Sequence, residues 1–257
     1  MDYSKEFQAQ SFGQIVLKHK KLPIYMTKEF SFYRCVEFKP DFYGKTVSEL
    51  FNGNLRFSSG RYSTLFPNRK ISYWSSSPSL ARAEIKSHGA GCDMLTFHAY
   101  DDATSFEPFL GIEEPLIIVD GRECGIQELI DKLDNDEELS LYEKEYFEQI
   151  INESIDCIAY NSKVRKGEEN YIFLEKGFKK LALRSLKLRF GRKNGGSHAY
   201  IQCAYGSDYL PYLKGYGFYF EPKCKIMMNE EYMKSEEFLT RKSNLDRRMI
   251  RNSFNKN

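Results

Sequence analysis

Alternating apolar and polar residues predict strands along much of the chain. Residues 30–38 (FSFYRCVEF) alternate with a period of two, which places Arg34 on the same face as Phe32 and Val36. A guanidinium on an apolar face costs free energy unless it has an anionic partner. Five more segments combine short apolar runs with turn residues at their ends and are predicted strands: residues 71–74 (ISYW), 93–100 (DMLTFHAY), 115–120 (PLIIVD), 155–162 (IDCIAYNS) and 170–178 (NYIFLEKGF).

Helical periodicity is clearest after the ISYW strand. Ser77 and Pro78 are a favourable N-cap and first-turn pair for a helix that runs to about His88. Successive residues of a helix turn by about 100°, so Glu84 lies roughly 40° from Leu80, inside the apolar stripe. The sequence therefore predicts that this helix turns a carboxylate inward.

Residues 126–153 are also predicted to be helical, with a second, turn-rich half after the DND sequence. Four apolar residues have the spacing of a core-facing stripe: Ile126, Leu129, Ile130 and Leu133. Residues 40–54 predict a loop with a short helix, and residues 55–63 (LRFSSGRYS) a strand that breaks into a glycine-containing turn. Residues 228–250 predict an exposed helix.

A chain of 257 residues can bury a substantial core and suits one domain with appendages or two small domains. Hydrophobic residues make up 41% of it, but no apolar run approaches the roughly 20 residues that cross a bilayer. We therefore expect a cytoplasmic protein with neither a membrane span nor a signal peptide. Six cysteines form no CxxC pair and have no histidine at metal-ligand spacing, which predicts small buried thiols of a reducing compartment and no metal site: Cys35, Cys92, Cys124, Cys157, Cys203 and Cys224.

The charges are almost balanced, with 38 basic and 36 acidic residues, so a general nucleic-acid binder is not indicated. Residues 126–153 are acidic, and residues 163–193 and the tail from Arg241 are basic, which we interpret as solvated helix faces and loops. Aromatic residues at 15% fit a core with many strands or a site that stacks planar ligands.

Arg34, Arg61, Tyr73 and Glu84 are the candidate site residues of the first third of the chain. Arginine suits phosphate because its planar fork donates two parallel hydrogen bonds and keeps its charge when buried. Tyr73 lies on the strand before the helix of Glu84, so a tight connection brings the two side chains near each other. A carboxylate in an apolar stripe is rare unless it is paired or functional, and it could stabilise positive charge in a transition state. The alternatives are arginines bridged to surface carboxylates, a tyrosine packed in the core, and an ion pair between Glu84 and an arginine.

Ser162 lies between an apolar strand and the turn-forming sequence KVRKGEE, a place where serine is usually a strand-end residue. No histidine accompanies it at a recognisable spacing and GxSxG is absent, which argues against a hydrolase triad. The four histidines form no HExxH signature, and neither GxGxxG nor GxxxxGK[ST] occurs.

Taken in order, the sequences YRCVEF, GRYS, ISYWSSSPSLARAE and DCIAYNS…GEENYIFL resemble the RES-domain toxins, a bacterial family named for its Arg, Glu and Ser. The family pattern has an early Arg, a Gly-Arg-Trp or similar turn, a strand Tyr followed by a serine-rich cap and a helix ending in Glu, and a later Tyr-x-Ser. Within residues 30–185 it matches Arg34, Arg61, Tyr73, Glu84 and Ser162. Tyr62 stands where the family frequently has Trp, and Ser-Gly precedes Arg61 in place of Gly-Gly.

The resemblance implies an α+β fold with an ADP-ribosyltransferase-like split β-sheet core and peripheral helices, and an activity that consumes NAD as its substrate. It implies that Arg34 and Arg61 bind the diphosphate or the adjoining ribose, and that Tyr73 stacks on or orients nicotinamide. Glu84 would face the cationic ribose of the transition state, with Ser162 bound to that ribose or to Glu84. An Xre-like antitoxin is the implied protein partner.

The nucleophile that receives the ribose stays open between inorganic phosphate, water and a protein side chain. A rival from another class is a non-catalytic module that holds a nucleotide or RNA with its arginines and basic tail, while Glu84 pairs with an arginine. The near-neutral charge ranks this rival second. We expect an N-terminal extension (1–29), a RES-like NAD-binding catalytic domain (30–190) and a C-terminal extension (191–257).

Overall fold

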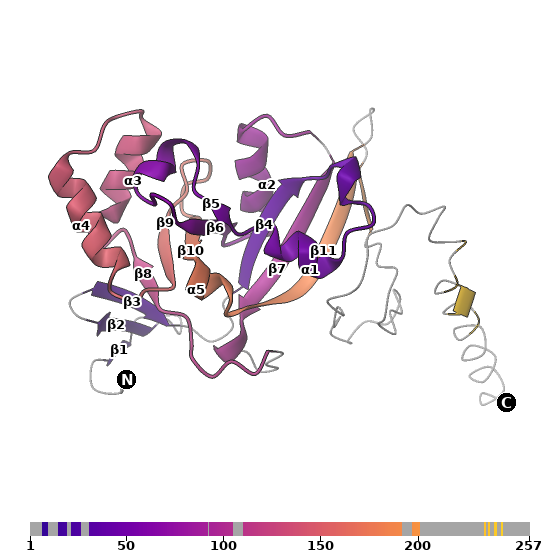
Figure 1. The fold of residues 1–257 in the computed structure, drawn as a ribbon, viewed down its shortest axis with the longest axis horizontal. Helices are drawn as coiled ribbons and strands as arrows, with labels where there is room; N and C mark the ends of the chain where they lie inside the picture. Colours follow the sequence, from indigo (N-terminus) through magenta and orange to yellow (C-terminus); the bar gives the residue numbers. More distant parts are fainter. Residues whose placement is uncertain are drawn as a thin grey trace.

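The computed structural model describes residues 31–91, 93–104 and 110–191, four strands outside these ranges, and five positions between 234 and 243. The described part is a mixed α+β fold in which twelve strands form one sheet (Figure 1). The strands are β1 (Phe7–Ala9), β2 (Ile15–His19), β3 (Leu22–Met26), β4 (Ser31–Glu37), β5 (Arg56–Phe57), β6 (Lys70–Ser75), β7 (Met94–Asp101), β8 (Ile118–Asp120), β9 (Cys157–Asn161), β10 (Glu169–Leu174), β11 (Leu181–Gly191) and β12 (Ser197–Tyr200). Their order is β1-β2-β3-β8-β9-β10-β6-β4-β7-β11-β12, with β5 paired to β6 beside this path.

Five α-helices and three short 3-10 helices connect the described strands. They are η2 (Pro40–Phe42), α1 (Val47–Asn52), η3 (Gly60–Thr64), α2 (Pro78–Ser87), η4 (Asp102–Thr104), α3 (Ile126–Asp134), α4 (Leu141–Ile151) and α5 (Glu175–Phe178). Ser77 caps α2 as predicted, because its hydroxyl accepts a hydrogen bond from the Leu80 backbone N–H. The α3 stripe is confirmed, since all four of its predicted core residues are buried.

The sheet opens between β6 and β4. β4 pairs with β7 along its whole length, and β6 pairs with β10 from Ile71 to Ser75. Between β4 and β6, in contrast, one register pair is formed, Tyr33 with Ser75. The two halves of the sheet therefore diverge from this point, and the strand edges that face each other leave room for side chains between them.

Side chains of the two faces of the sheet form separate hydrophobic clusters. Trp74 belongs to one cluster and its neighbour Tyr73 packs against the other, as expected for alternating residues of a strand. The first cluster includes residues of α1 and α5, and the second includes residues of α3 and α4. A third, smaller cluster lies under α2, which packs on β4, β6 and β7.

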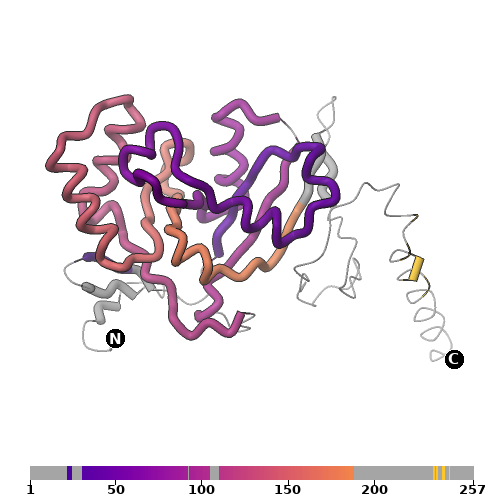
Figure 2. The backbone as a smooth tube through the Cα atoms, in the orientation of Figure 1, coloured from indigo at the N-terminus to yellow at the C-terminus, as the bar shows by residue number. Residues whose placement is uncertain are grey.

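Figure 2 shows the η3 segment beside α3, between the α3–α4 pair and α2. Gly60 opens this segment with φ = 65°, a left-handed conformation that glycine adopts without steric cost. The predicted glycine-containing turn after a short strand is therefore confirmed, and Arg61 follows its glycine directly.

Three predicted elements differ from the structure. The run at 115–120 forms a strand of three residues, because the backbone N–H groups of Leu116 and Ile117 donate to aspartate carboxylates instead of a neighbouring strand. The turn-rich half of 126–153 is the helix α4, which begins with a capping box between Ser140 and Glu143. The strand predicted for 170–178 ends at Leu174, where α5 begins.

The sheet continues across the predicted domain boundaries. β3 lies in the segment 1–29, pairs with β8, and contributes Leu22 and Ile24 to the core with α3 and α4. β12 lies in the segment 191–257 and pairs with β11. The boundaries at residues 30 and 190 therefore do not coincide with edges of the sheet.

The structure describes some of the residues on which the predictions for the cysteines and the C-terminal helix depend. Cys35 and Cys157 are buried thiols and Cys124 is half-buried, whereas the other three cysteines lie outside the described residues. The described positions of the predicted helix 228–250 are helical and exposed. In the described part of the chain, every helix is too short or too polar to cross a membrane.

Candidate functional site

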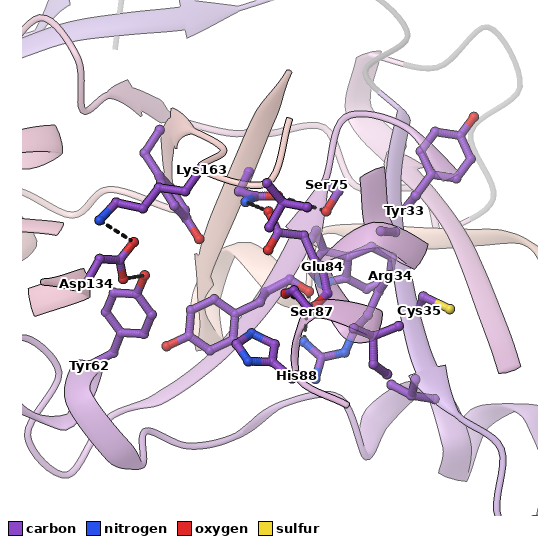
Figure 3. A pocket seen from close by; sticks show the side chains of 18 of the residues that line it. Tyr33, Arg34, Cys35, Tyr62, Ser75, Glu84, Ser87, His88, Asp134 and Lys163 are labelled. Atoms are coloured by element: carbon purple, nitrogen blue, oxygen red, sulfur yellow. Dashed lines mark hydrogen bonds and ion pairs between the residues drawn. The ribbon is translucent and has the colours of Figure 1, made fainter. Parts of the chain in front are cut away.

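A cavity of about 620 Å³ lies where the two halves of the sheet diverge (Figure 3). Its volume is within the range of about 300–1,000 Å³ that is usual for small-molecule sites. It separates the cluster under α2 from the cluster under α3 and α4, because side chains packed against both line it. The lining residues are Tyr33, Arg34, Cys35, Val36, Ser59, Gly60, Arg61, Tyr62, Tyr73, Trp74, Ser75, Ala81, Glu84, Ile85, Ser87, His88, Asp134, Tyr160, Lys163, Val164 and Asn170.

Four of the five candidate residues line this cavity, each from a different element. Arg34 comes from β4, Arg61 from η3, Tyr73 from β6 and Glu84 from α2. Ser162 follows β9 and does not line the cavity; it lies behind Glu84 and donates a hydrogen bond to it. Its position favours the second of its two expected roles, holding Glu84, over contact with a ribose.

Glu84 is half-buried, so its carboxylate reaches the cavity and is not enclosed by the apolar stripe of α2. Its Oε1 accepts two hydrogen bonds, from Ser162 Oγ at 2.6 Å and from Asn170 Nδ2 at 2.6 Å. The predicted alternative, an ion pair with an arginine, is not formed among the described residues. With both donors on one oxygen, Oε2 keeps its acceptor capacity for a ligand.

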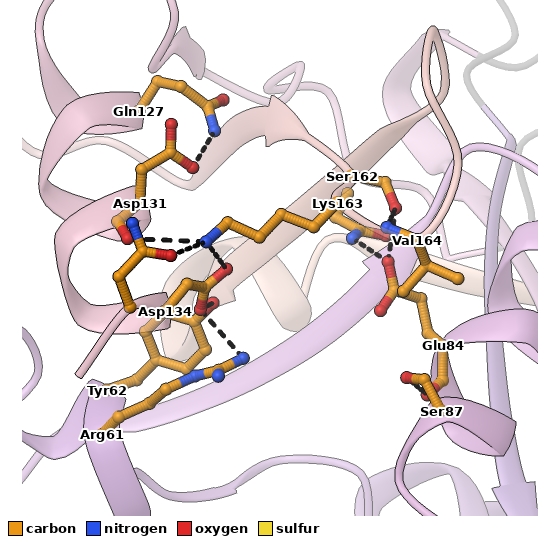
Figure 4. A network of polar contacts seen from close by, with 12 residues as sticks. Arg61, Tyr62, Glu84, Ser87, Gln127, Asp131, Asp134, Ser162, Lys163 and Val164 are labelled. Atoms are coloured by element: carbon orange, nitrogen blue, oxygen red, sulfur yellow. Dashed lines mark hydrogen bonds and ion pairs between the residues drawn. The ribbon is translucent and has the colours of Figure 1, made fainter.

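The two donors to Glu84 are themselves held in place, as Figure 4 shows for Ser162. Ser162 Oγ accepts hydrogen bonds from the backbone N–H groups of Val164 at 3.1 Å and Arg165 at 3.2 Å, which directs its own O–H toward Glu84. Asn170 Oδ1 accepts a hydrogen bond from Ser75 Oγ at 2.8 Å, which directs the amide N–H₂ toward Glu84. Each donor is thus oriented by a further contact, as in preorganised sites.

Arg34 has no acidic partner among the residues that the structure describes. Its Nη1 donates to the Tyr73 carbonyl oxygen at 2.8 Å, across the gap between β4 and β6. Its Nε is buried without an acceptor, and no carboxylate of the described residues forms an ion pair with it. Burial, with a smaller contribution from the nearby Arg56, lowers the pKa of Arg34 to about 10, so the guanidinium remains charged at neutral pH. The anionic partner that the sequence requires is therefore missing from the described protein.

Arg61 differs, because it forms a carboxylate bridge. The predicted alternative named a surface carboxylate, whereas the side chain of the partner, Asp134, is 8% exposed. Its Nη2 lies 2.9 Å from Asp134 Oδ1, and the same oxygen accepts a hydrogen bond from Tyr62 Oη at 2.9 Å. Lys163 Nζ lies 3.5 Å from Asp134 Oδ2. Figure 4 shows these groups gathered around Asp134, and Figure 3 shows Asp134 and Arg34 on opposite sides of the cavity.

Phenol rings form much of the wall near this end. The rings of Tyr62 and Tyr73 lie with their centroids 5.5 Å apart, and Tyr160 is buried beside them. Burial raises the pKa of Tyr73, with a further contribution from Tyr62, so the phenol stays neutral at physiological pH. The wall therefore offers uncharged planar surfaces to a ring-shaped ligand.

Several lining residues were missed by sequence reasoning. Asp134 had a detectable signal, since an acid in the last turn of a helix opposes the helix dipole and needs a compensating cation. The one signal for Lys163 is its position next to the candidate residue Ser162 in the sequence. Asn170 and Tyr160 had no local signal, because the pairing of β10 with β6 and β9 brings them to the site.

No group of three or more metal-ligating side chains occurs among the residues that the structure describes. Comparisons with models of protein families, with curated proteins and with solved structures gave no match.

Proposed function

We propose that this protein cleaves the bond between nicotinamide and ribose in NAD. One observation carries the proposal: Arg34, with a buried Nε and no acidic partner among the described residues, faces the same cavity as the Glu84 carboxylate, whose Oε2 accepts no hydrogen bond from those residues. A ligand that joins an anion to a centre of developing positive charge matches both groups. NAD has a diphosphate, and loss of its nicotinamide leaves a ribose with oxocarbenium character.

Each lining group has a role in this proposal. Arg34 binds the diphosphate, and Arg61 uses the N–H groups not engaged by Asp134 for the adjoining ribose. Tyr73 orients the nicotinamide ring. Glu84 stabilises the ribose cation as the C–N bond breaks and its electron pair leaves with neutral nicotinamide, and a nucleophile then adds to the ribose carbon.

The proposal includes membership of the RES-domain family, which the sequence motifs resemble. The opening between β6 and β4 supports an ADP-ribosyltransferase-like split sheet, and the convergence of Arg34, Tyr73 and Glu84 on one cavity supports a RES-like site. A toxin role and an Xre-like antitoxin follow from that resemblance. Growth arrest on expression of the wild type, relieved by Glu84→Gln, is the expected outcome in cells.

The direct test measures nicotinamide release from NAD by the purified protein. Glu84→Gln keeps an acceptor oxygen for Ser162 and Asn170, so the fold should be retained, but it removes the charge and should lower kcat by about 10²–10³-fold. Glu145→Gln is the matched control, because Glu145 is an exposed glutamate of α4 that does not line the cavity. Equal nicotinamide release by wild type and Glu84→Gln would falsify the proposal.

The acceptor is identified in the same assay. Nicotinamide release that requires inorganic phosphate, with a product of the mass of ADP-ribose phosphate, indicates phosphorolysis. Release without phosphate and a product of the mass of ADP-ribose indicates hydrolysis, and a mass increase on a protein indicates transfer.

A further inference from the structure

Asp134 holds a central position among the charged groups at one end of the cavity. Its side chain is 8% exposed, yet it meets Arg61, Tyr62 and Lys163, which come from two other segments of the chain. Arg61 and Lys163 are 41% and 42% exposed, so the buried member of the cluster is the acid. Two cations that converge on one carboxylate have the arrangement of an anion-binding site, in which the carboxylate takes the place of the anion.

Asp134 is also placed against the preference of its own helix. It lies in the last turn of α3, where the helix dipole disfavours negative charge. Lys163 adds to the compensation, with its Nζ 3.5 Å from Asp134 Oδ2 and positioned by a hydrogen bond to Asn135 Oδ1 at 3.1 Å. The cations of η3 and of the β9–β10 loop therefore hold the carboxylate at the cavity wall.

We propose that Asp134 is a specificity-determining residue that occupies the anion position between Arg61 and Lys163 and excludes ligand phosphates from this end of the cavity. The diphosphate is then directed to Arg34, which has no acidic partner in the described chain, and the Tyr62 end is left for uncharged rings. The proposal rests on the proposed function in treating the cavity as the site of a diphosphate ligand. Its test, however, needs no turnover of NAD.

The test is isothermal titration of the purified protein with inorganic pyrophosphate at low salt. Asp134→Asn keeps an acceptor for Arg61 and Tyr62 but removes the charge, so it should bind pyrophosphate about 10-fold more tightly than the wild type. The gain should shrink as salt is raised, because the freed cations are partly exposed. Asp134→Ser removes the same charge with a shorter side chain and should also gain affinity.

Asp136→Asn is the matched control. It makes the same change of charge two residues further on, at an exposed residue that does not line the cavity, and asparagine tolerates its φ of 58°. We expect it to change pyrophosphate affinity by less than about twofold, because the charge it removes is exposed and screened.

Lys163→Met tests the same idea in a protein that keeps Asp134. If Asp134 already occupies the anion position, loss of Lys163 should weaken pyrophosphate binding by less than about threefold. Unchanged or weaker binding by folded Asp134→Asn, or a loss of more than about 10-fold in Lys163→Met, would overturn the proposal and make Asp134 a positioning residue for Arg61. If the wild type does not cleave NAD, the proposed function is wrong. The pyrophosphate affinities still decide whether Asp134 excludes phosphate from this end of the cavity.

Discussion

Two carboxylates face the cavity, Glu84 from α2 and Asp134 from the last turn of α3, and their partners are of opposite kinds. Glu84 accepts hydrogen bonds from the neutral groups of Ser162 and Asn170, whereas Asp134 meets the cations Arg61 and Lys163. Neutral donors orient a carboxylate without cancelling its charge. Cations orient it and cancel its charge as well. The difference separates an acid that can act on a ligand from an acid that is already satisfied.

The arginines show the same contrast in reverse. Arg61 has Asp134 as its partner, whereas the partner of Arg34 among the described residues is a backbone carbonyl. A buried charge without a counter-ion lowers the stability of the fold, and it is retained where a ligand supplies the missing charge. The two ends of the cavity therefore differ in charge compensation: Arg61 is paired with an acid at one end, and Arg34 has no acidic partner in the described chain at the other.

The largest expected effect compares the same acid-to-amide change at the two carboxylates. Glu84→Gln should lower kcat for nicotinamide release by about 10²–10³-fold, because the charge that stabilises the transition state is lost. Asp134→Asn should act on KM for NAD and lower it, because it frees the charges of Arg61 and Lys163 for a phosphate. Steady-state kinetics of both variants measure the split, and a fall in kcat of similar size for both would erase the contrast.

The next effect compares the two arginines. Arg34→Met should weaken binding of ADP-ribose by about 10- to 100-fold, since a charge-assisted hydrogen bond is worth about 1.5–3 kcal/mol. Its free energy of unfolding should be unchanged or higher, because a half-buried charge without an acidic partner in the described chain has been removed. Arg61→Met should weaken binding less and lower the free energy of unfolding by about 0.5–1 kcal/mol, through loss of the ion pair.

Titration calorimetry with ADP-ribose and urea unfolding provide the two readouts for these arginine variants. Arg34→Met that binds ADP-ribose like the wild type would remove the assignment of this cation to the diphosphate. A large fall in the free energy of unfolding of Arg34→Met would show that the guanidinium stabilises the fold by more than one hydrogen bond to Tyr73 explains.

A smaller effect is expected from the groups that orient Glu84. Ser162→Ala and Asn170→Ala should each lower kcat by about 10-fold with little change in KM, because they act on the position of the carboxylate. Both donors hold the same oxygen, so the double variant should lose less than the product of the two. Asn170→Gln should lower kcat as Asn170→Ala does, since the longer side chain misplaces the amide that donates to Glu84. Strictly multiplicative losses in the double variant would show that the two donors act independently.

The smallest expected effect concerns acid stability at the Arg34 end. Tyr33 lines the cavity there and stacks on His98, with ring centroids 4.5 Å apart. Burial, with a contribution from Arg184, lowers the pKa of His98 to about 4, so the folded protein holds this ring neutral while the unfolded chain protonates it near pH 6.5. Stability should therefore fall as the pH drops from about 6.5 to 4 and then level off.

His98→Asn removes this contribution. The difference in melting temperature between pH 7 and pH 4.5 should be smaller in the variant than in the wild type by roughly 2–4 °C. Thermal unfolding at the two pH values measures it. An unchanged difference would mean that other groups set the acid sensitivity.

The sequence was sufficient for most local structure. The period of two around Arg34, the Ser77–Pro78 start of α2 and the apolar stripe of α3 depend on neighbouring residues, and all three are present as predicted. Elements were misjudged where distant groups decided them. The strand at 115–120 is short because the carboxylates of Asp101 and Asp156 take its N–H groups, and neither lies next to it in the sequence.

For the site, the sequence determined which side chains were out of place: a guanidinium on an apolar face and a carboxylate in an apolar stripe. Local periodicity reveals such conflicts because burial of charge is costly wherever it occurs. Only the tertiary structure decided which conflicts the protein resolves itself. The pairing of β10 with β6 brings Asn170 to Glu84, and the packing of η3 on α3 brings Asp134 to Arg61, whereas nothing in the described chain supplies an acid to Arg34. Compensation of charge depends on distances of a few ångströms between remote segments, and those distances are set by the fold.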